Sequence, residues 1–258
     1  MKLSFPMGRS RSVAGGSKAE PATMTLVEHL TELRNRIIKI LIALAVGVAI
    51  GFVLYNPVLD ILQKPYCEVS ERCSFLVTDP IESLSVRLKV STYVGFLIAS
   101  PAIMWQIWRF ITPGLHDKEK RWAIPFVVAS VGLFVLGAGL ALWTFPQALT
   151  FFVQVGGDSL TTMYSPSKYL SLVIFLMLTF GLGFEFPIVL IFLQMAGMLS
   201  WRTLSSWRRY AAVVIVVLVA VITPSGDPFT LIALSLPMYL FYECSILIGR
   251  FLIKNPDR

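Results

Sequence analysis

Apolar runs of about twenty residues recur along this chain, and they constrain its fold more than any other feature. A run of that length spans the roughly 30 Å hydrocarbon core of a bilayer as an α-helix. The composition agrees, because 56% of the 258 residues are hydrophobic and only 14% are charged, whereas soluble domains carry about 25% charged residues. The sequence therefore predicts an all-α integral membrane protein and excludes an ordinary soluble enzyme and a disordered scaffold.

Six apolar segments are predicted to be transmembrane helices. The fifth is short, since its residues make only about 18 Å of helix, and it ends at a turn beginning with Thr223 and Pro224. The apolar stretch of the sixth ends before Glu243. We expect helices 5 and 6 to form a short hairpin, and Pro101 and Pro187 to bend helices 2 and 4 so that the bundle is concave. The six segments are 37–55, 90–111, 122–145, 169–195, 211–222 and 229–253.

The basic residues are distributed unevenly around these helices. Of the 22 Lys and Arg, 17 precede or enter helix 1, lie at loops 2 and 4 or lie at the C-terminal end of the chain from Arg250 onward, and five lie in loops 1 and 3. Basic residues collect on the cytoplasmic side of a membrane, so both termini are predicted to be cytoplasmic. The predicted organisation is a flexible cytoplasmic tail (1–24), a six-helix transmembrane domain (25–254) and a short cytoplasmic C-terminus (255–258). The net charge of +7 then indicates orientation and does not require a nucleic-acid partner.

The first external loop gives two further predictions. Cys67 and Cys73 form either a local disulfide or two unpaired thiols, and their spacing does not decide between these. Asp79 and Pro80 are typical of the N-cap and first residue of an additional helix, which would run into helix 2 and cap the outer face. Three cysteines and two histidines are too few for a multi-ligand metal site, so neither a metal nor a cofactor is expected.

Three acidic side chains are candidates for function. Glu32 and Glu119 lie on the basic side of the membrane, where together they could bind two guanidinium groups. Alternatively, Glu32 pairs with Arg36 and Glu119 is a solvated loop charge. Glu185 lies inside helix 4, where a carboxylate costs about 2.5–3.5 kcal/mol, so a functional role is favoured over a protonated carboxyl that donates to a neighbouring helix.

The remaining polar and aromatic positions favour structural roles. Trp105, Trp108 and Phe110 are interpreted as an interfacial aromatic belt, and Asp227 as a turn residue that caps helix 6. The sequence contains no Gly-x-Ser-x-Gly elbow, His-Glu-x-x-His motif, P-loop or dinucleotide fingerprint. No catalytic residue and no enzyme activity are therefore predicted.

Several motifs, in order along the chain, resemble the TatC family of the twin-arginine protein translocase. The resemblance covers nearly everything after the N-terminal tail. The motifs are HLTELRNR at 29–36, SPAIMWQIWRFITPGL at 100–115, KEKR at 118–121, FEFP at 184–187, Thr223-Pro224 with Asp227, and LPMY at 236–239 with Glu243.

That resemblance implies the core receptor of a bacterial inner-membrane translocase, which binds twin-arginine signal peptides and exports folded proteins using the proton-motive force. It favours the shared site over the isolated charges for Glu32 and Glu119. The partners it implies are TatA- and TatB-type single-helix subunits at the helix 5–6 hairpin, further copies of the chain and membrane lipid. The residues implied are Glu32, Glu119, Arg34 and Phe110 for signal-peptide binding, Glu185 on the concave face, and Thr223, Asp227, Pro65 and Glu243 for partner docking or structure.

The sequence departs from the family pattern at the last turn. Gly226 is an additional residue there, and Leu231 stands where the family form carries a polar Gln. Two rival functions are a proton-coupled permease that carries its proton on Glu185 and an intramembrane aspartyl protease that uses Asp227. The first lacks the internal repeat usual in such permeases, and the second lacks a partner aspartate inside another helix.

Overall fold

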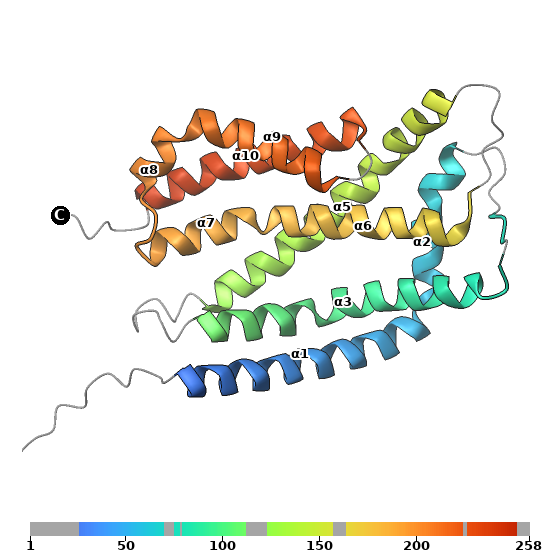
Figure 1. The fold of residues 1–258 in the computed structure, drawn as a ribbon, viewed down its shortest axis with the longest axis horizontal. Coiled ribbons are helices and arrows are strands. Elements are labelled where there is room, and N and C mark those ends of the chain that lie inside the picture. Colours follow the sequence, from blue (N-terminus) through green and yellow to red (C-terminus); the bar gives the residue numbers. More distant parts are fainter. Residues whose placement is uncertain are drawn as a thin grey trace, which may run out of the picture.

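The computed structural model describes residues 26–69, 75–77, 79–111, 123–156, 164–223 and 226–251, and every regular element in these ranges is an α-helix (Figure 1). Five helical stretches are long and apolar enough to cross a membrane, with α6 and α7 counted as one. The predicted tail 1–24 lies outside these ranges, as does the C-terminus 255–258. The helices are α1 (Leu26–Val53), α2 (Tyr55–Val69), α3 (Glu82–Ile111), α5 (Ala123–Gly156), α6 (Pro166–Phe184), α7 (Phe186–Met195), α8 (Trp201–Ser206), α9 (Arg208–Ile222) and α10 (Pro228–Phe251).

The last two helices differ in length. α9 has 15 residues, about 22 Å of helix, and is too short to span a bilayer comfortably, as predicted. α10 has 24 residues, so the prediction that helix 6 is also short is wrong. Glu243 does not end α10, because its carboxylate pairs with the Nη2 of Arg208, at 2.9 Å, and accepts a hydrogen bond from Tyr239 Oη, at 3.2 Å.

The cap at the other end of the bundle is a helix that the sequence did not predict. Figure 1 shows α2 running steeply across the ends of α3 and α6, and it packs against α3 and α5. Leu62 and Tyr66 of α2 are buried, and Tyr169 Oη donates to the Leu62 carbonyl at 3.0 Å. The helix expected after Asp79 exists only as the first turns of α3, where Asp79 Oδ1 accepts a hydrogen bond from Ile81 N at 2.8 Å.

α1 packs against α3 through glycine. Among the described residues of α1, only Gly47 and Gly51 are buried, and they lie one turn apart on one face. A Cβ atom at Gly47 would overlap the Gly95 carbonyl oxygen, and one at Gly51 would overlap the Ser91 carbonyl oxygen. Small residues at this spacing bring helix backbones into close contact in membranes. The outer face of α1 stays apolar and exposed, as lipid contact requires.

The main hydrophobic core extends through most of the bundle, and it includes the contact of α5 with α6. Gly137 of α5 sits against the Phe180 carbonyl, and Gly181 of α6 sits against the ring of Phe134, so both contacts have no room for a Cβ. Phe134 and Phe180 are completely buried. A second, smaller core surrounds Trp108, whose ring lies 4.4 Å from that of Phe126 and 5.5 Å from that of Phe192. Trp108 is therefore a core residue, and its assignment to an interfacial belt is wrong.

The glycine contacts make a test of the α1–α3 packing. We expect Gly51→Ala to lower the free energy of unfolding by about 1–3 kcal/mol, because the added methyl group forces the two backbones apart. Gly139→Ala is the matched control, since nothing lies within 4 Å of a Cβ there, and alanine stabilises an exposed helix position by up to about 1 kcal/mol. Thermal unfolding in detergent measures both. Equal effects of the two substitutions would contradict the close packing.

Candidate functional site

Glu32 lies in the second turn of α1, at the end of the bundle where α1 begins and α3 and α7 end (Figure 1). The Nε of Arg36 donates to Glu32 Oε1 at 3.1 Å, and its Nη2 contacts the same oxygen. Arg36 Nη1 also donates to Gln106 Oε1 of α3 at 3.5 Å. The pair proposed from the i,i+4 spacing therefore exists, and it connects α1 to α3. Glu32 Oε2 is buried and has no hydrogen-bond partner in the described part of the chain.

A cavity of about 360 Å³ opens beside this pair, and we call it the Glu32 cavity. Its lining holds one carboxylate and three cationic side chains, so the described part of its wall is net positive. A cationic ligand is therefore repelled by this lining unless another negatively charged group lies nearby. The lining residues are Glu32, Asn35, Arg36, Lys39 and Arg109.

The other residues predicted for this site are placed differently. Phe110 follows Arg109 on α3 and is half-buried, whereas Arg34 is exposed on α1 and does not line the cavity. Glu119, the second predicted carboxylate, lies outside the described residues. Lys39, Gln106 and Arg109 were not among the predicted site residues. Glu32, Arg36 and Lys39 are spaced four and three residues apart, so the sequence places them on one face of α1. Nothing in the sequence indicates which residues of α3 lie opposite that face.

Glu185 occupies the break between α6 and α7. Pro187 cannot donate a backbone hydrogen bond, so the helix is interrupted here. Glu185 is the C-cap residue of α6 and the N-cap residue of α7. Ser130 Oγ of α5 donates to Glu185 Oε2 at 2.6 Å, while Oε1 is buried without a partner among the described residues. A bond to a neighbouring helix is therefore present, but the Ser130 hydroxyl is its donor, and a protonated carboxyl that donates stays a prediction.

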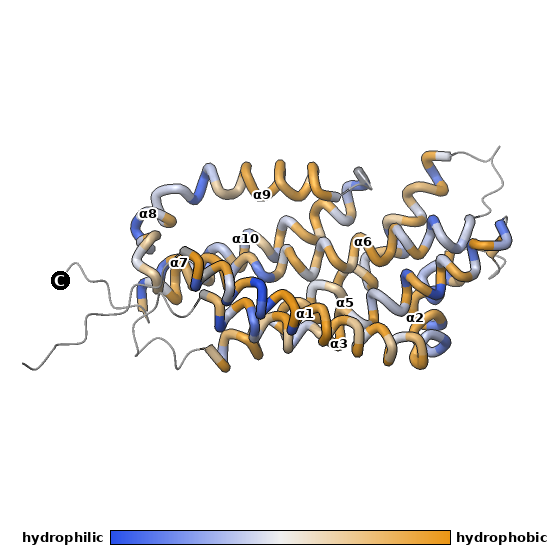
Figure 2. The backbone as a smooth tube through the Cα atoms, turned by 60° about the horizontal axis from the view of Figure 1, so that its bottom comes forward, coloured by the Kyte–Doolittle hydropathy of each residue, from blue (hydrophilic) through white to orange (hydrophobic). Residues whose placement is uncertain are grey.

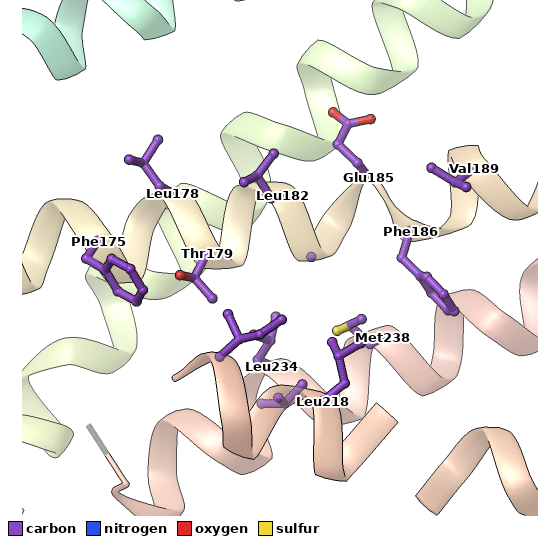
Figure 3. Close-up of a pocket in the computed structure, with 13 residues that line it drawn as sticks. Phe175, Leu178, Thr179, Leu182, Glu185, Phe186, Val189, Leu218, Leu234 and Met238 are labelled. Carbon is purple, nitrogen blue, oxygen red and sulfur yellow. The ribbon is translucent and has the colours of Figure 1, made fainter. Parts of the chain in front are cut away.

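Glu185 also lines a cavity of about 550 Å³ between α6, α7, α9 and α10, which we call the Glu185 cavity. Figure 3 shows Glu185 turned away from Leu234 and Met238, toward the side of its helix that faces α5. Among the described lining residues, Thr179 is the only other one with a side-chain hydrogen-bonding group. The interior is thus an apolar recess with one carboxyl at its border, on the side where a concave face was predicted.

Comparisons with known proteins identify the family. Residues 28–237 match the family of the Sec-independent protein translocase protein (TatC). The chain belongs to the TatC family. It is therefore a membrane component of a protein translocase and not an enzyme.

Individual TatC proteins extend the match to most of the chain. The TatC of Aquifex aeolicus is 40% identical over 90% of this chain and 97% of its own length. The TatC of Frankia casuarinae is 39% identical over 89% of this chain, which spans 66% of that longer relative. A solved TatC described as a twin arginine translocase receptor superposes with a TM-score of 0.72 and 40% identity, over 88% of this chain and all of that one.

Three residues that the TatC resemblance singled out lie on the α9–α10 hairpin. Thr223 ends α9 and is buried, with its Oγ1 donating to the Val219 carbonyl at 2.7 Å. Asp227, 1% exposed, accepts from Thr230 N at 2.7 Å and from Thr230 Oγ1 at 2.6 Å. Asp227 thus caps α10, as predicted from the turn. Glu243 pairs with Arg208 and so joins α10 to the start of α9, whereas Thr223 and Asp227 each stabilise one helix end beside the turn.

Pro65 and Cys67 both lie in α2 rather than in a loop. Pro65 is buried and lines a small cavity between α2 and α5 with Pro146. Cys67 is disulfide-bonded and Cys244 is free, while Cys73 lies outside the described residues. The disulfide alternative is therefore present at Cys67, and its pairing with Cys73 stays a prediction. Within the described ranges no three His, Cys, Asp or Glu side chains are grouped closely enough to hold a metal ion.

The cap at Asp227 can be tested by substitution. We expect Asp227→Ala to cost about 1–2 kcal/mol of stability, since two hydrogen bonds to Thr230 are lost and the first turn of α10 is left uncapped. Asp227→Asn keeps one acceptor and loses less. Asp60→Ala, at an exposed aspartate of α2, is the matched control. Chemical unfolding in detergent gives the free energy of unfolding of the three variants. If Asp227→Ala were as stable as Asp60→Ala, the cap would not contribute to the stability of α10.

Proposed function

We propose that this TatC-family chain is the signal-peptide receptor of a twin-arginine translocase in the bacterial cytoplasmic membrane. It binds the paired arginines of a signal peptide at the Glu32 cavity and assembles with TatA- and TatB-type subunits and with copies of itself. Folded cargo then crosses the membrane at the expense of the proton-motive force, without a cofactor. Both termini lie in the cytoplasm, in agreement with the basic residues at the end of the bundle where α1 begins.

The strongest support is the unsatisfied oxygen of Glu32. Arg36 saturates Oε1, whereas Oε2 is buried, has no partner in the described part of the chain and belongs to a residue that lines a cavity. A buried carboxylate oxygen without a donor is costly, and a guanidinium group supplies donors in the geometry that a carboxylate accepts. The site can therefore accept one further guanidinium beside Arg36.

Glu119 supplies the charge that this site lacks. Three cations surround Glu32 in the cavity, and an incoming pair of arginines would add two more. A second carboxylate, contributed by the segment that follows α3, offsets that repulsion and gives the second guanidinium its own acceptor. Recognition of two arginines, rather than one, then follows from two carboxylates that act together.

The rest of the signal peptide and the partners need apolar surfaces, and both are present. The Glu185 cavity offers an apolar recess of about 550 Å³. On α9, Figure 2 shows a hydrophobic run beyond its basic start, and Val217 and Val221 are 56% and 78% exposed. A single-helix partner packs against such a surface by van der Waals contact.

The rival functions lack comparable support. A proton-coupled permease needs a series of polar groups through the membrane, yet in the described residues Glu185 bonds only to Ser130, and its cavity is otherwise apolar. A protease would need Asp227 free to act on a peptide bond. Both of its oxygens instead accept hydrogen bonds from Thr230.

Peptide binding tests the receptor role. We expect a twin-arginine signal peptide to bind the purified protein about tenfold or more tightly than its Lys-Lys counterpart, because lysine cannot form the bidentate pair. Glu32→Gln and Glu119→Gln should each weaken binding of the arginine peptide about tenfold, since each removes a charge-assisted hydrogen bond. Fluorescence anisotropy gives the dissociation constants.

The control for this experiment is Glu68→Gln, which removes an exposed carboxylate from α2 at the opposite end of the bundle. It should bind the arginine peptide as the unmodified protein does. Equal affinity for both peptides, or equal losses in all three variants, would show that general charge rather than the Glu32 cavity controls binding.

Photo-crosslinking tests the partner surface. We expect a photoreactive amino acid at Val221 of α9 to capture a single-helix subunit in membranes that contain the complete translocase. The same amino acid at Ile42, 60% exposed on the outer face of α1, should capture little or none. Immunoblotting of the crosslinked products compares the two positions. Stronger capture at Ile42 would place the partners on α1 and contradict the proposed docking on α9.

A further inference from the structure

A second groove, which we call the α3–α6 groove, lies between α3 and α6 at the end of the bundle where both helices begin (Figure 1). Its volume is about 650 Å³, within the range of pockets that bind small molecules. Phe175, Leu178 and Leu182 separate it from the Glu185 cavity, because these three side chains line both. The groove has no role in the proposed binding of signal peptides or partners.

One end of the groove is cationic. Lys89 is exposed, and its Nζ donates to Ser167 Oγ at 2.7 Å and to Ser171 Oγ at 2.8 Å. Its remaining contact, with the Ser167 carbonyl, is long at 3.5 Å, so one of the three ammonium donors is poorly used. The nearby acid, Glu82, is bound by Ser165 Oγ and Ser167 N. Within the described residues Lys89 has no ion pair, and its charge is available to an anion.

Tyr93 places a second polar group in the same groove. Its side chain is only 3% exposed and lines the groove, and its Oη has no hydrogen-bond partner among the described residues. An unpaired buried hydroxyl costs roughly as much as a lost hydrogen bond, so a ligand that offers an acceptor here is favoured. Tyr93 follows Lys89 by four residues, on the same face of α3 and about 6 Å further along its axis.

Beyond Tyr93 the groove is apolar. Phe96 of α3 and Phe175, Leu178 and Leu182 of α6 continue it, and on α6 the last three recur at the spacing of one helix face. Phe175 and Leu182 are 44% and 57% exposed. Along one line the groove thus presents a cation, a hydroxyl donor and then a hydrocarbon-like surface.

We infer that the α3–α6 groove binds one glycerophospholipid with a preference for an anionic headgroup. Lys89, which Ser167 and Ser171 hold in place, binds the phosphate. Tyr93 Oη donates to an ester carbonyl, and an acyl chain lies against Phe96, Phe175 and Leu178. The order of these groups along the groove is the order of headgroup, glycerol ester and acyl chain in the lipid.

A lipid fits this sequence of groups better than a transmembrane helix does. A helix in hydrocarbon satisfies its carbonyl groups internally, so it offers Tyr93 no ready acceptor, and its apolar side chains offer Lys89 no anion. A phospholipid supplies both acceptors and the chain in one molecule. Because Lys89 bears a single unpaired positive charge, a lipid with net negative charge neutralises it.

Native mass spectrometry of the purified, delipidated protein tests this site, with phosphatidylglycerol and phosphatidylcholine of the same acyl chains added back in turn. We expect one phosphatidylglycerol to bind about fivefold more tightly than phosphatidylcholine, because one lysine contributes about that factor toward an anionic lipid. Lys89→Gln should remove the preference. Tyr93→Phe should instead weaken both lipids about fivefold, since it removes only a hydrogen bond to the ester.

Two matched controls lie outside the groove. Lys168→Gln removes an exposed lysine of α6, and Tyr210→Phe removes the hydroxyl of an exposed tyrosine of α9; both should bind lipid as the unmodified protein does. The proposed site would be contradicted if Lys89→Gln kept the preference for phosphatidylglycerol over phosphatidylcholine. It would also be contradicted if Lys168→Gln lost that preference to the same extent as Lys89→Gln.

Photo-crosslinking distinguishes the occupant in membranes. A photoreactive amino acid at Leu178, inside the groove, should yield a product heavier by one phospholipid. A product heavier by a polypeptide would assign the groove to a protein partner and overturn the lipid. Because this readout needs neither signal peptide nor partner subunits, it is independent of the receptor role proposed above.

Discussion

Polar groups inside this bundle have to find their partners within the chain, because hydrocarbon offers none. Most of them do. Gln194 donates to the Ser245 carbonyl at 3.0 Å, and Tyr242 donates to the Leu204 carbonyl at 2.6 Å, so α7 and α8 are both joined to α10. Ser100 Oγ donates to the Leu97 carbonyl at 2.7 Å, which is the carbonyl that Pro101 leaves without its usual donor. Satisfied groups such as these fix the arrangement of the helices.

Three of the exceptions to that constraint coincide with the proposed sites, whereas Ser91 Oγ, Gln194 Oε1 and Ser235 Oγ are buried without partners elsewhere in the described part of the chain. Glu32 Oε2, Glu185 Oε1 and Tyr93 Oη are buried without partners in the described part of the chain, and each residue lines a cavity. The two cavities at opposite ends of α3 also differ in chemistry, with a carboxylate that lacks a donor at one end and a cation that lacks an anion at the other. One helix thus carries part of the proposed cationic-peptide site and part of the proposed lipid site, at its two ends.

Most of the helical architecture follows from the sequence, but the contacts that create the cavities do not. Length and hydropathy alone predict the long spans, and Pro187 predicts the break at Glu185. α2 was missed because Pro57, Asp60 and Pro65 interrupt any apolar run, and it is a helix since Leu62 and Tyr66 are buried against α3, α5 and α6. The pairing of Ser130 with Glu185 and of Lys89 with Ser171 joins residues 55 and 82 positions apart. Such pairs depend on the rotation of each helix about its axis, which a single sequence does not specify.

The short α9 has a consequence for the membrane beside it. α9 is about 22 Å long and its neighbour α10 about 36 Å, and both ends of this hairpin are tied, by Arg208 with Glu243 and by the capped turn at Asp227. A helix shorter than the bilayer cannot correct the mismatch by tilting, because tilt shortens its span further. The mismatch therefore acts on the lipid, and we expect the bilayer to be thinner along α9. That thinning lies next to the exposed valines on which a single-helix partner is proposed to dock, so partners that gather there would assemble where the barrier to a folded protein is already lowest.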